Sequence, residues 1–259
     1  MTGVAPRVHP RADVDPSVEL GEGAIVEAGA VIEAGVRLGP RSVVRVGTVL
    51  HVGTQVGADA LLGPYAVVGG EPMDTRYRGE STRVVLGDGV VLREFVSVHR
   101  STGEATETSI GQGTLVMSGA HVSHNCVVGA RCVLTTQVQL GGHAEVGDDA
   151  VLGANAMVHQ FCRVGRGAML GAASGTNQDV LPFLMARGSP ARHYRLNRVG
   201  LLRRETPADT YAALEAAVRA LRRRDTERFA ELARAHPVVA ELQAFVASSR
   251  RGVTRFQGA

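Results

Sequence analysis

The chain has no tryptophan and no lysine, and it has few aromatic residues of any kind. Aromatic side chains make up 4% of its 259 residues, so Val, Leu, Ala and Gly must fill the interior. A core of small and aliphatic residues favours regular stacking. The three cysteines lack paired spacing, which supports neither a disulfide framework nor a zinc ribbon.

Long apolar runs are also missing. No stretch of 18 apolar residues is present, which argues against stable membrane insertion. The first ten residues, MTGVAPRVHP, lack the apolar segment of a secretory signal, so we expect a cytoplasmic protein. The formal net charge of +3 does not demand nucleic acid as a partner. However, residues 192–259 hold 14 Arg against 7 acidic residues, which suits an acidic or phosphate-bearing partner.

What the chain does contain is a period of six. From Val8 to Val68 every sixth residue is Val, Leu or Ile. The register resumes at Leu86 and runs to Leu170, with Glu104 as the exception. We call these aliphatic residues the lead positions. In the first run, the residue four places after each lead position is small or β-branched. This pattern fits neither a helix nor an alternating strand, and it predicts a parallel β-helix of about 18 residues per turn. Both sets of residues should point inward.

The register also assigns a direction to the cysteines and histidines. Three cysteines fall in the inward small position, which predicts core packing: Cys126, Cys132 and Cys162. Five histidines fall outside the inward positions and are expected on the surface of the coil: His99, His121, His124, His143 and His159. His124 and His143 are one coil plus one residue apart, so they should be close neighbours at one corner.

Two stretches interrupt the hexads. Residues 69–84 are polar and glycine-rich and are predicted to leave the coil as a loop, while residues 101–109 form either a shorter excursion or a degenerate hexad. Loops that stand out from a rigid scaffold commonly carry binding groups. In the first loop, Asp74 offers an acceptor, and Arg76 and Arg78 offer donors suited to phosphate.

The end of the chain follows another pattern. After Leu170 the hexads fade, and from about residue 197 the apolar spacing becomes helical. Asp225 is a plausible helix cap, and Pro237 can open a further helix. We therefore predict a β-helix domain over 1–192 and a domain of three or four short helices over 193–259.

An ordered set of segments along the chain resembles one family within the hexapeptide-repeat acyltransferase superfamily. These segments are MDTRYRGE, SVHRST, GAHVSHNC, GGH, MVHQFC, SGTNQD and NRVGLLRR. The family is that of the acyl-ACP–UDP-N-acetylglucosamine O-acyltransferases, which begin lipid A biosynthesis. The resemblance implies a left-handed parallel β-helix followed by a small C-terminal α-helical domain. It also implies homotrimers with active sites between subunits, and no metal or other cofactor.

The resemblance implies a reaction and a set of site residues. A 3-hydroxyacyl chain would pass from acyl carrier protein to the 3-hydroxyl of the UDP-sugar, with His124 as general base and the Gly142 N–H as oxyanion donor. Imidazole suits the role because it titrates near the working pH. The substrate-binding residues would be Asp74, Arg76, His99, His121, His143, His159, Gln160, Asn197, Arg203 and Arg204. The acidic carrier protein would dock on the basic tail region.

Acyl-chain length would be set at Ala172 and Met169. The small side chain of Ala172 predicts a long rather than a short donor. The chain also departs from the family pattern at four places. Asn125 stands where Asp is common, Arg76 where Lys is usual, and Met73 where Gln is usual. Glu205 and Thr206 stand where Gly and an aromatic residue are common. An asparagine can orient a neighbouring imidazole but cannot stabilise the imidazolium by charge.

Three alternatives remain open on the sequence. The same scaffold could form an amide on the 3-amino analogue of the UDP-sugar. A trimeric β-helix zinc enzyme of the carbonic anhydrase type could use His121 and His124 together with a third histidine from another chain. Outside enzymology, the chain could be an inactive trimeric scaffold, although a histidine cluster on one outer face argues against that reading.

Overall fold

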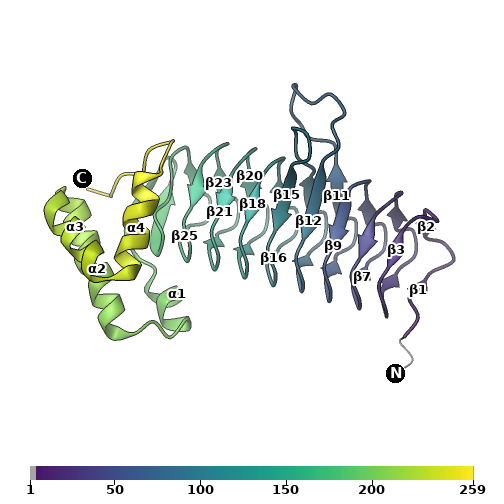
Figure 1. Ribbon diagram of the computed structural model, residues 1–259, viewed down its shortest axis with the longest axis horizontal. Helices are drawn as coiled ribbons and strands as arrows, with labels where there is room; N and C mark the ends of the chain where they lie inside the picture. The colour runs from purple at the N-terminus through teal and green to yellow at the C-terminus, as the bar shows by residue number, and fades with distance from the viewer. Residues whose placement is uncertain (1–3, 259) are drawn as a thin grey trace.

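Three parallel sheets form the body of the protein, a computed structural model of which describes residues 4–258 (Figure 1). Neighbouring strands in a sheet come from successive coils, so Val43 pairs with Leu61, 18 residues further along. Each coil therefore contains three short strands, one per sheet, separated by tight turns. The predicted parallel β-helix with about 18 residues per turn is confirmed.

From β1 to β26 the strands of the three sheets follow one another in strict rotation, and β27 and β28 then form an antiparallel hairpin on the first sheet. The first sheet comprises β1 (Arg7–Val8), β4 (Ile25–Val26), β7 (Val43–Val44), β10 (Leu61–Leu62), β13 (Val91–Leu92), β16 (Leu115–Val116), β19 (Val133–Leu134), β22 (Val151–Leu152), β25 (Met169–Leu170), β27 (Leu184–Gly188) and β28 (Ala191–Leu196). The second comprises β2 (Asp13–Val14), β5 (Val31–Ile32), β8 (Val49–Leu50), β11 (Val67–Gly70), β14 (Ser97–His99), β17 (His121–Val122), β20 (Gln139–Leu140), β23 (Met157–Val158) and β26 (Gly175–Thr176). The third comprises β3 (Glu19–Leu20), β6 (Arg37–Leu38), β9 (Thr54–Val56), β12 (Arg83–Leu86), β15 (Glu107–Ile110), β18 (Val127–Val128), β21 (Glu145–Val146) and β24 (Arg163–Val164).

We call the turn from the first to the second sheet the first corner. The turn from the second to the third sheet is the second corner, and the turn from the third sheet to the next coil is the third corner. Left-handed backbone at single turn residues, such as Asn125 (φ 58°) and His143 (φ 60°), tightens these corners. Residues 18 apart therefore stack in columns along the coil, about 4.8 Å apart.

The lead and small positions of the hexads make up the core. Leu50 and Leu134 are both fully buried, as are the three cysteines. Their inward placement is thus confirmed. Val8 differs, with 43% of its surface exposed, because it lies in the first coil and has a neighbouring coil on one side only.

Both interruptions leave the coil. Across the first, Leu61 pairs with Val91, which stretches the spacing from 18 to 30 residues. Across the second, Val91 pairs with Leu115, at a spacing of 24. The second stretch is therefore an excursion and not a degenerate hexad, and this explains why Glu104 breaks the aliphatic series. The first loop projects visibly from the coil in Figure 1.

Within the described residues, four helices close the C-terminal end: α1 (Arg198–Arg203), α2 (Ala208–Arg223), α3 (Thr226–Ala235) and α4 (Pro237–Ala247). Asp225 caps α3 by accepting a hydrogen bond from the Arg228 N–H, and Pro237 opens α4. The helices share a second core with the last coil, in which Leu181, Leu214 and Leu242 are buried. None of the helices within residues 4–258 combines the length and apolar character needed to cross a membrane.

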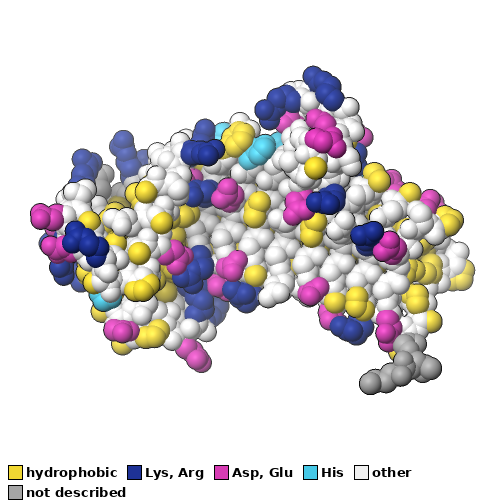
Figure 2. Space-filling view, in the orientation of Figure 1, with side chains coloured by type: hydrophobic (Ala, Val, Ile, Leu, Met, Phe, Trp, Pro, Cys, Tyr) yellow, Lys and Arg dark blue, Asp and Glu magenta, His cyan; other side chains and the backbone are white. Residues whose placement is uncertain are grey.

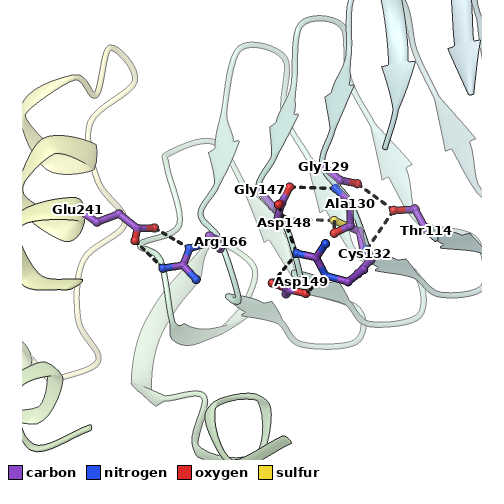
Figure 3. A network of polar contacts seen from close by, with 10 residues as sticks. Thr114, Gly129, Ala130, Cys132, Gly147, Asp148, Asp149, Arg166 and Glu241 are labelled. Carbon is purple, nitrogen blue, oxygen red and sulfur yellow. Dashed lines mark hydrogen bonds and ion pairs between the residues drawn. The ribbon is translucent and has the colours of Figure 1, made fainter. Parts of the chain in front are cut away.

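Two further contacts join the end of the chain to the coil. Arg166, at the third corner, forms two hydrogen bonds with Glu241 of α4, at 2.9 and 2.5 Å (Figure 3). Beyond α4 the chain returns to the coil as an extended tail. There the Gly252 carbonyl accepts from the Asp179 N–H at 2.8 Å. Strand structure continues to Leu196, so the first helix begins only after the last antiparallel hairpin, β27–β28.

Candidate active site

A cavity of about 860 Å³ runs along the second sheet and its second corner. Its wall is built from residues that recur every 18 positions. The columns that supply it are His121, Gln139, Met157 and Gly175; Ser123, Gly141, His159 and Asn177; and His124, Gly142 and Gln160. Met73 from the first loop, and Ser189 and Pro190 from the β27–β28 hairpin, complete the wall. Figure 2 shows histidine side chains at the surface beside the projecting loop.

His124 is the most enclosed of the cavity's histidines, at 8% exposed. Its side chain lies outside the coil interior, as expected, but it is buried and not on an open surface. The cause is the neighbouring coil: the ring of His143 packs edge-on against it with centroids 5.3 Å apart. The expected proximity of these two histidines at one corner is confirmed.

Asn125 fixes the tautomer of His124. Its Oδ1 lies 2.9 Å from His124 Nδ1 and accepts from the Thr102 N–H at 3.0 Å, while its Nδ2 donates to the Thr102 carbonyl at 3.0 Å. A backbone N–H can only donate and a carbonyl can only accept, so the amide has one possible orientation. Nδ1 of His124 must then carry the proton, which leaves the Nε2 lone pair free.

The unprotonated nitrogen of His124, Nε2, lies close to the backbone of Gly142. A Cβ added to Gly142 would lie 2.5 Å from His124 Nε2, so only glycine leaves room for the imidazole. Among residues 4–258 the Gly142 N–H has no protein acceptor. A hydrogen-bond donor and a proton acceptor therefore stand side by side on the cavity wall.

His121 and His99 form a second histidine pair. Their ring centroids are 5.2 Å apart, and His121 Nδ1 lies 2.9 Å from Ser97 Oγ. Burial lowers the pKa of His121 to about 4, with smaller contributions from His99 and His124. His121 is therefore neutral at physiological pH and can serve as a hydrogen-bonding group. His99 Nδ1 donates to the Glu71 carbonyl at 2.6 Å and so holds the base of the first loop.

The first loop brings Asp74 toward the histidines. The carboxylate is 8% exposed and pairs with Arg76 at 2.9 Å. This pairing, with a smaller contribution from His124, holds the pKa of Asp74 far below its usual range. Arg100 supports the loop from beneath, because it donates to the Gly69 carbonyl at 3.1 Å. The loop thus holds the Asp74 carboxylate next to Met73, which lines the cavity.

Four predicted site residues lie elsewhere in the protomer. His143 stacks on Phe161 behind His124, and burial lowers its pKa. Asn197 is buried and caps α1, with its amide donating to the Gly167 carbonyl at 3.0 Å. Arg204 packs against Gly167 at the third corner, and Arg203 is exposed at the end of α1. Within one protomer, neither arginine reaches the cavity.

A smaller cavity of about 390 Å³ lies at the first corner and shares Gln139 and Met157 with the larger one. Ala173 lines it, next to the predicted length-determining residue Ala172, which is exposed. Met169 is half-buried in β25 and does not line either cavity. The two cavities together form a groove across the second sheet.

Sequence reasoning missed several groups that line or support the site: Ser97, Thr102, Ser123, Gln139, Met157, Asn177, Ser189 and Pro190. A signal existed for those in the columns. Gln139 and Met157 follow His121 at steps of 18, and Asn177 stands 18 after His159. Thr102 and the hairpin residues carried no such signal, because they lie outside the repeat.

No group of three or more His, Cys, Asp or Glu side chains within residues 4–258 is arranged to hold a metal ion. The zinc alternative would therefore have to draw at least one ligand from another chain. The buried cysteines are also unsuited to the chemistry of this cavity. Burial raises the pKa of Cys126 to about 12, which suppresses the thiolate.

Comparison with known proteins shows the family. The family described as Udp N-acetylglucosamine O-acyltransferase, domain 2, matches residues 179–254. An acyl-[acyl-carrier-protein]–UDP-N-acetylglucosamine O-acyltransferase of Burkholderia orbicola is 40% identical across 96% of this chain and 99% of its own. One from Burkholderia mallei is 37% identical across 75% of this chain and 78% of its own.

Solved structures give the same result. The UDP-N-acetylglucosamine acyltransferase of Francisella novicida has a TM-score of 0.93 at 28% identity, covering 97% of this chain and 95% of its own. The Moraxella catarrhalis UDP-N-acetylglucosamine O-acyltransferase has a TM-score of 0.90 at 31% identity, covering 96% and 99%. The fold is the predicted left-handed β-helix with a small helical domain. On this similarity over nearly its whole length, the chain is an acyltransferase that belongs to the family of acyl-[acyl-carrier-protein]–UDP-N-acetylglucosamine O-acyltransferases.

Proposed function

We propose that the chain transfers a 3-hydroxyacyl group from an acyl carrier protein to the 3-hydroxyl of UDP-N-acetylglucosamine, the first step of lipid A biosynthesis. The observation that supports this most directly is the arrangement around His124. Its tautomer leaves Nε2 without a proton, and the adjacent Gly142 offers an N–H. A base and an oxyanion donor on one cavity wall are what acyl transfer to a hydroxyl needs.

The reaction needs no covalent enzyme intermediate. His124 Nε2 takes the proton of the sugar 3-hydroxyl as that oxygen attacks the thioester carbon. The carbonyl oxygen becomes an oxyanion that accepts from the Gly142 N–H. When the tetrahedral intermediate collapses, the C–S bond breaks, the ester remains on the sugar, and the imidazolium returns its proton to the leaving thiolate. Asn125 stabilises the required orientation throughout by accepting from Nδ1.

The position of Arg204 supports a site shared between copies of the chain. It lies at the third corner, away from the cavity, and no carboxylate within residues 4–258 forms an ion pair with it. A cation at the opposite corner can meet a diphosphate in the cavity of another copy. We accordingly propose a homotrimer in which Asn197, Arg203 and Arg204 complete a neighbour's site. We also propose that the enzyme acts in the cytoplasm.

The test is acyl transfer from 3-hydroxyacyl carrier proteins of several lengths to UDP-N-acetylglucosamine. His124→Ala should lower kcat by about 100-fold or more, because general-base catalysis contributes about that much. His9→Ala, an exposed histidine in the first coil, is the matched control and should retain wild-type kcat. Retained activity in His124→Ala would disprove its role. Preference for the 3-amino sugar in the same assay would support amide formation instead.

A further inference from the structure

A second hollow, rich in arginine, opens at the C-terminal end of the coil. It measures about 620 Å³ and is lined by Asn177, Gln178, Pro190, Arg192, Arg250, Arg251 and Arg255. We call it the arginine hollow. None of these lining residues is acidic, and within residues 4–258 none of the four arginines forms an ion pair with a carboxylate. Arginine is suited to phosphate oxygens because its donors match them in pairs.

The hollow is held in place by backbone hydrogen bonds and not by its arginine side chains. The Gly252 carbonyl accepts from the Asp179 N–H at 2.8 Å, and the Arg255 carbonyl accepts from the His193 N–H at 2.8 Å. Between these two contacts, Thr254 is buried and donates its own N–H to the Asp179 carbonyl at 2.9 Å. Arg251 and Arg255 therefore project from a fixed tail, and no carboxylate within residues 4–258 pairs with their guanidinium groups.

The arginine hollow is continuous with the active-site cavity. The two share Asn177 and Pro190 in their walls. Arg251 Nη2 also lies 3.3 Å from His159 Nδ1, and His159 lines the active-site cavity. A ligand seated at His124 can thus extend along the groove into the arginine hollow without leaving the surface.

The distance between His124 and the arginine hollow indicates which substrate phosphate can reach the hollow. Asn177 stands three coils beyond Ser123, the residue before His124, which is about 14 Å at the spacing of parallel strands. About 13 bonds separate the thioester sulfur from the phosphorus of a phosphopantetheine arm, which spans about 15 Å when extended. About five bonds separate the sugar 3-oxygen from the nearer phosphorus of the diphosphate, which is only about 6 Å.

We propose that the arginine hollow binds the phosphate that joins the pantetheine arm of the acyl donor to its carrier protein. This inference rests on the proposed function, because the donor must carry such an arm. It assigns Arg251 and Arg255 to recognition of the donor and not of the sugar nucleotide. The hollow then fixes where the arm ends and so places the thioester beside His124.

The test compares two small donors, an acyl-4′-phosphopantetheine and the same acyl-pantetheine without the phosphate. Wild type should have a kcat/KM about 10-fold or more higher for the phosphorylated donor, since hydrogen bonds to charged groups contribute on that scale. The double variant Arg251→Ser/Arg255→Ser should lose this preference and keep its KM for UDP-N-acetylglucosamine. The matched control, Arg7→Ser/Arg11→Ser, makes the same charge change in the first coil and should retain the preference.

A binding measurement separates this inference from the reaction itself. In calorimetric titration with 4′-phosphopantetheine, the double variant should bind at least about 10-fold more weakly than wild type. Arginine-dependent binding without any acyl transfer would support the hollow and count against the proposed function. Three results would overturn the inference: equal losses with both donors, a loss confined to the intact acyl carrier protein, or a raised KM for the sugar nucleotide.

Discussion

His124 Nδ1 and Asn125 Oδ1 lie 2.9 Å apart, and this contact decides which imidazole nitrogen can act as a base. The asparagine does not choose its own orientation. The backbone of Thr102, on the second excursion, accepts from its Nδ2 and donates to its Oδ1. A carboxylate at this position would place an oxygen against the Thr102 carbonyl, so the amide is the better match for this particular loop.

Asn125→Asp should therefore change the pH dependence of catalysis. A carboxylate beside the imidazole favours its protonated form, so the acid limb of the kcat/KM profile should move up by about one pH unit. The variant should also be slower at neutral pH, because less of the base is free. The control is Ala105→Asp, which adds the same charge at an exposed position of the second excursion. In this variant the acid limb of the kcat/KM profile should stay at its wild-type pH. An unshifted profile in Asn125→Asp would refute the role of this contact.

Gly142→Ala should reduce kcat by about 100-fold, because the added methyl group displaces the imidazole from its position. The backbone of Gly142 does not need positive φ, so the collision with His124 is the main effect. The control is internal: in a His124→Ala background the same change should cost little further activity. Additive losses in the double variant would mean that Gly142 acts independently of the base.

Arg100→Ala should loosen the first loop. The side chain is 11% exposed and donates to Tyr77 Oη at 3.0 Å as well as to the Gly69 carbonyl. Loss of these charge-assisted hydrogen bonds should speed trypsin cleavage after Arg76 and Arg78 by about 10-fold. Mass spectrometry of the fragments measures this directly.

The matched control for the loop is Arg83→Ala. Arg83 pairs with Glu107 at the surface, where ion pairs contribute little, so cleavage after Arg76 should keep its wild-type rate. Equal sensitivity of both variants would show that Arg100 has no special role in holding the loop.

His193 should make the fold sensitive to acid. Burial lowers the pKa of His193 to about 4, below the ordinary value of 6.5. The folded state therefore holds the neutral ring, and the unfolded chain takes up a proton first as the pH falls. The contribution of neutral His193 to the free energy of unfolding should be complete above pH 6.5. It should fall by about 3 kcal/mol between pH 6.5 and 4.

Urea unfolding at several pH values measures that contribution. His193→Gln should remove this part of the pH dependence, although it also lowers stability at neutral pH by disturbing the acceptor of the Leu181 N–H. His9→Gln changes an exposed histidine and should keep the wild-type slope. A His193→Gln slope equal to that of wild type would contradict the assignment.

Ala172→Leu should shorten the preferred acyl donor. The residue adjoins the smaller cavity of the groove, and a larger side chain removes space for the end of a long chain. We expect the ratio of kcat/KM for long over short donors to fall by about 10-fold. Ala34→Leu, an exposed alanine near the first coils, should leave the ratio unchanged. An unchanged ratio in Ala172→Leu would place the end of the chain elsewhere.

Much of the site could be predicted because the repeat is regular. A spacing of 18 puts Gln139 and Met157 beside His121, and it puts Gly142 beside His124. Knowing the direction of one residue in a column fixes the direction of the others. The family resemblance added which of these columns carries chemistry, which the repeat alone does not distinguish.

The remainder depended on contacts made outside the repeat. Asp74 lies on a loop whose course no period constrains, and Arg204 lies at the third corner because α1 packs there. The arginine hollow exists only because the tail after α4 pairs with residues near 179 and 193. Such pairings join segments far apart in the chain, so local patterns carry no information about them.

The sequence by itself determined the coil, its inward-facing residues and the stacking of the histidine columns. These follow from short-range periodicity, because the aliphatic residue of each hexad points into the coil and packs against the neighbouring coils. Only the tertiary structure decided the protonation state of the site. The tautomer of His124 depends on Asn125 meeting the backbone of Thr102, 23 residues away on an excursion from the coil. Hydrogen-bond direction is a property of that three-dimensional contact, and it cannot be read from residue types.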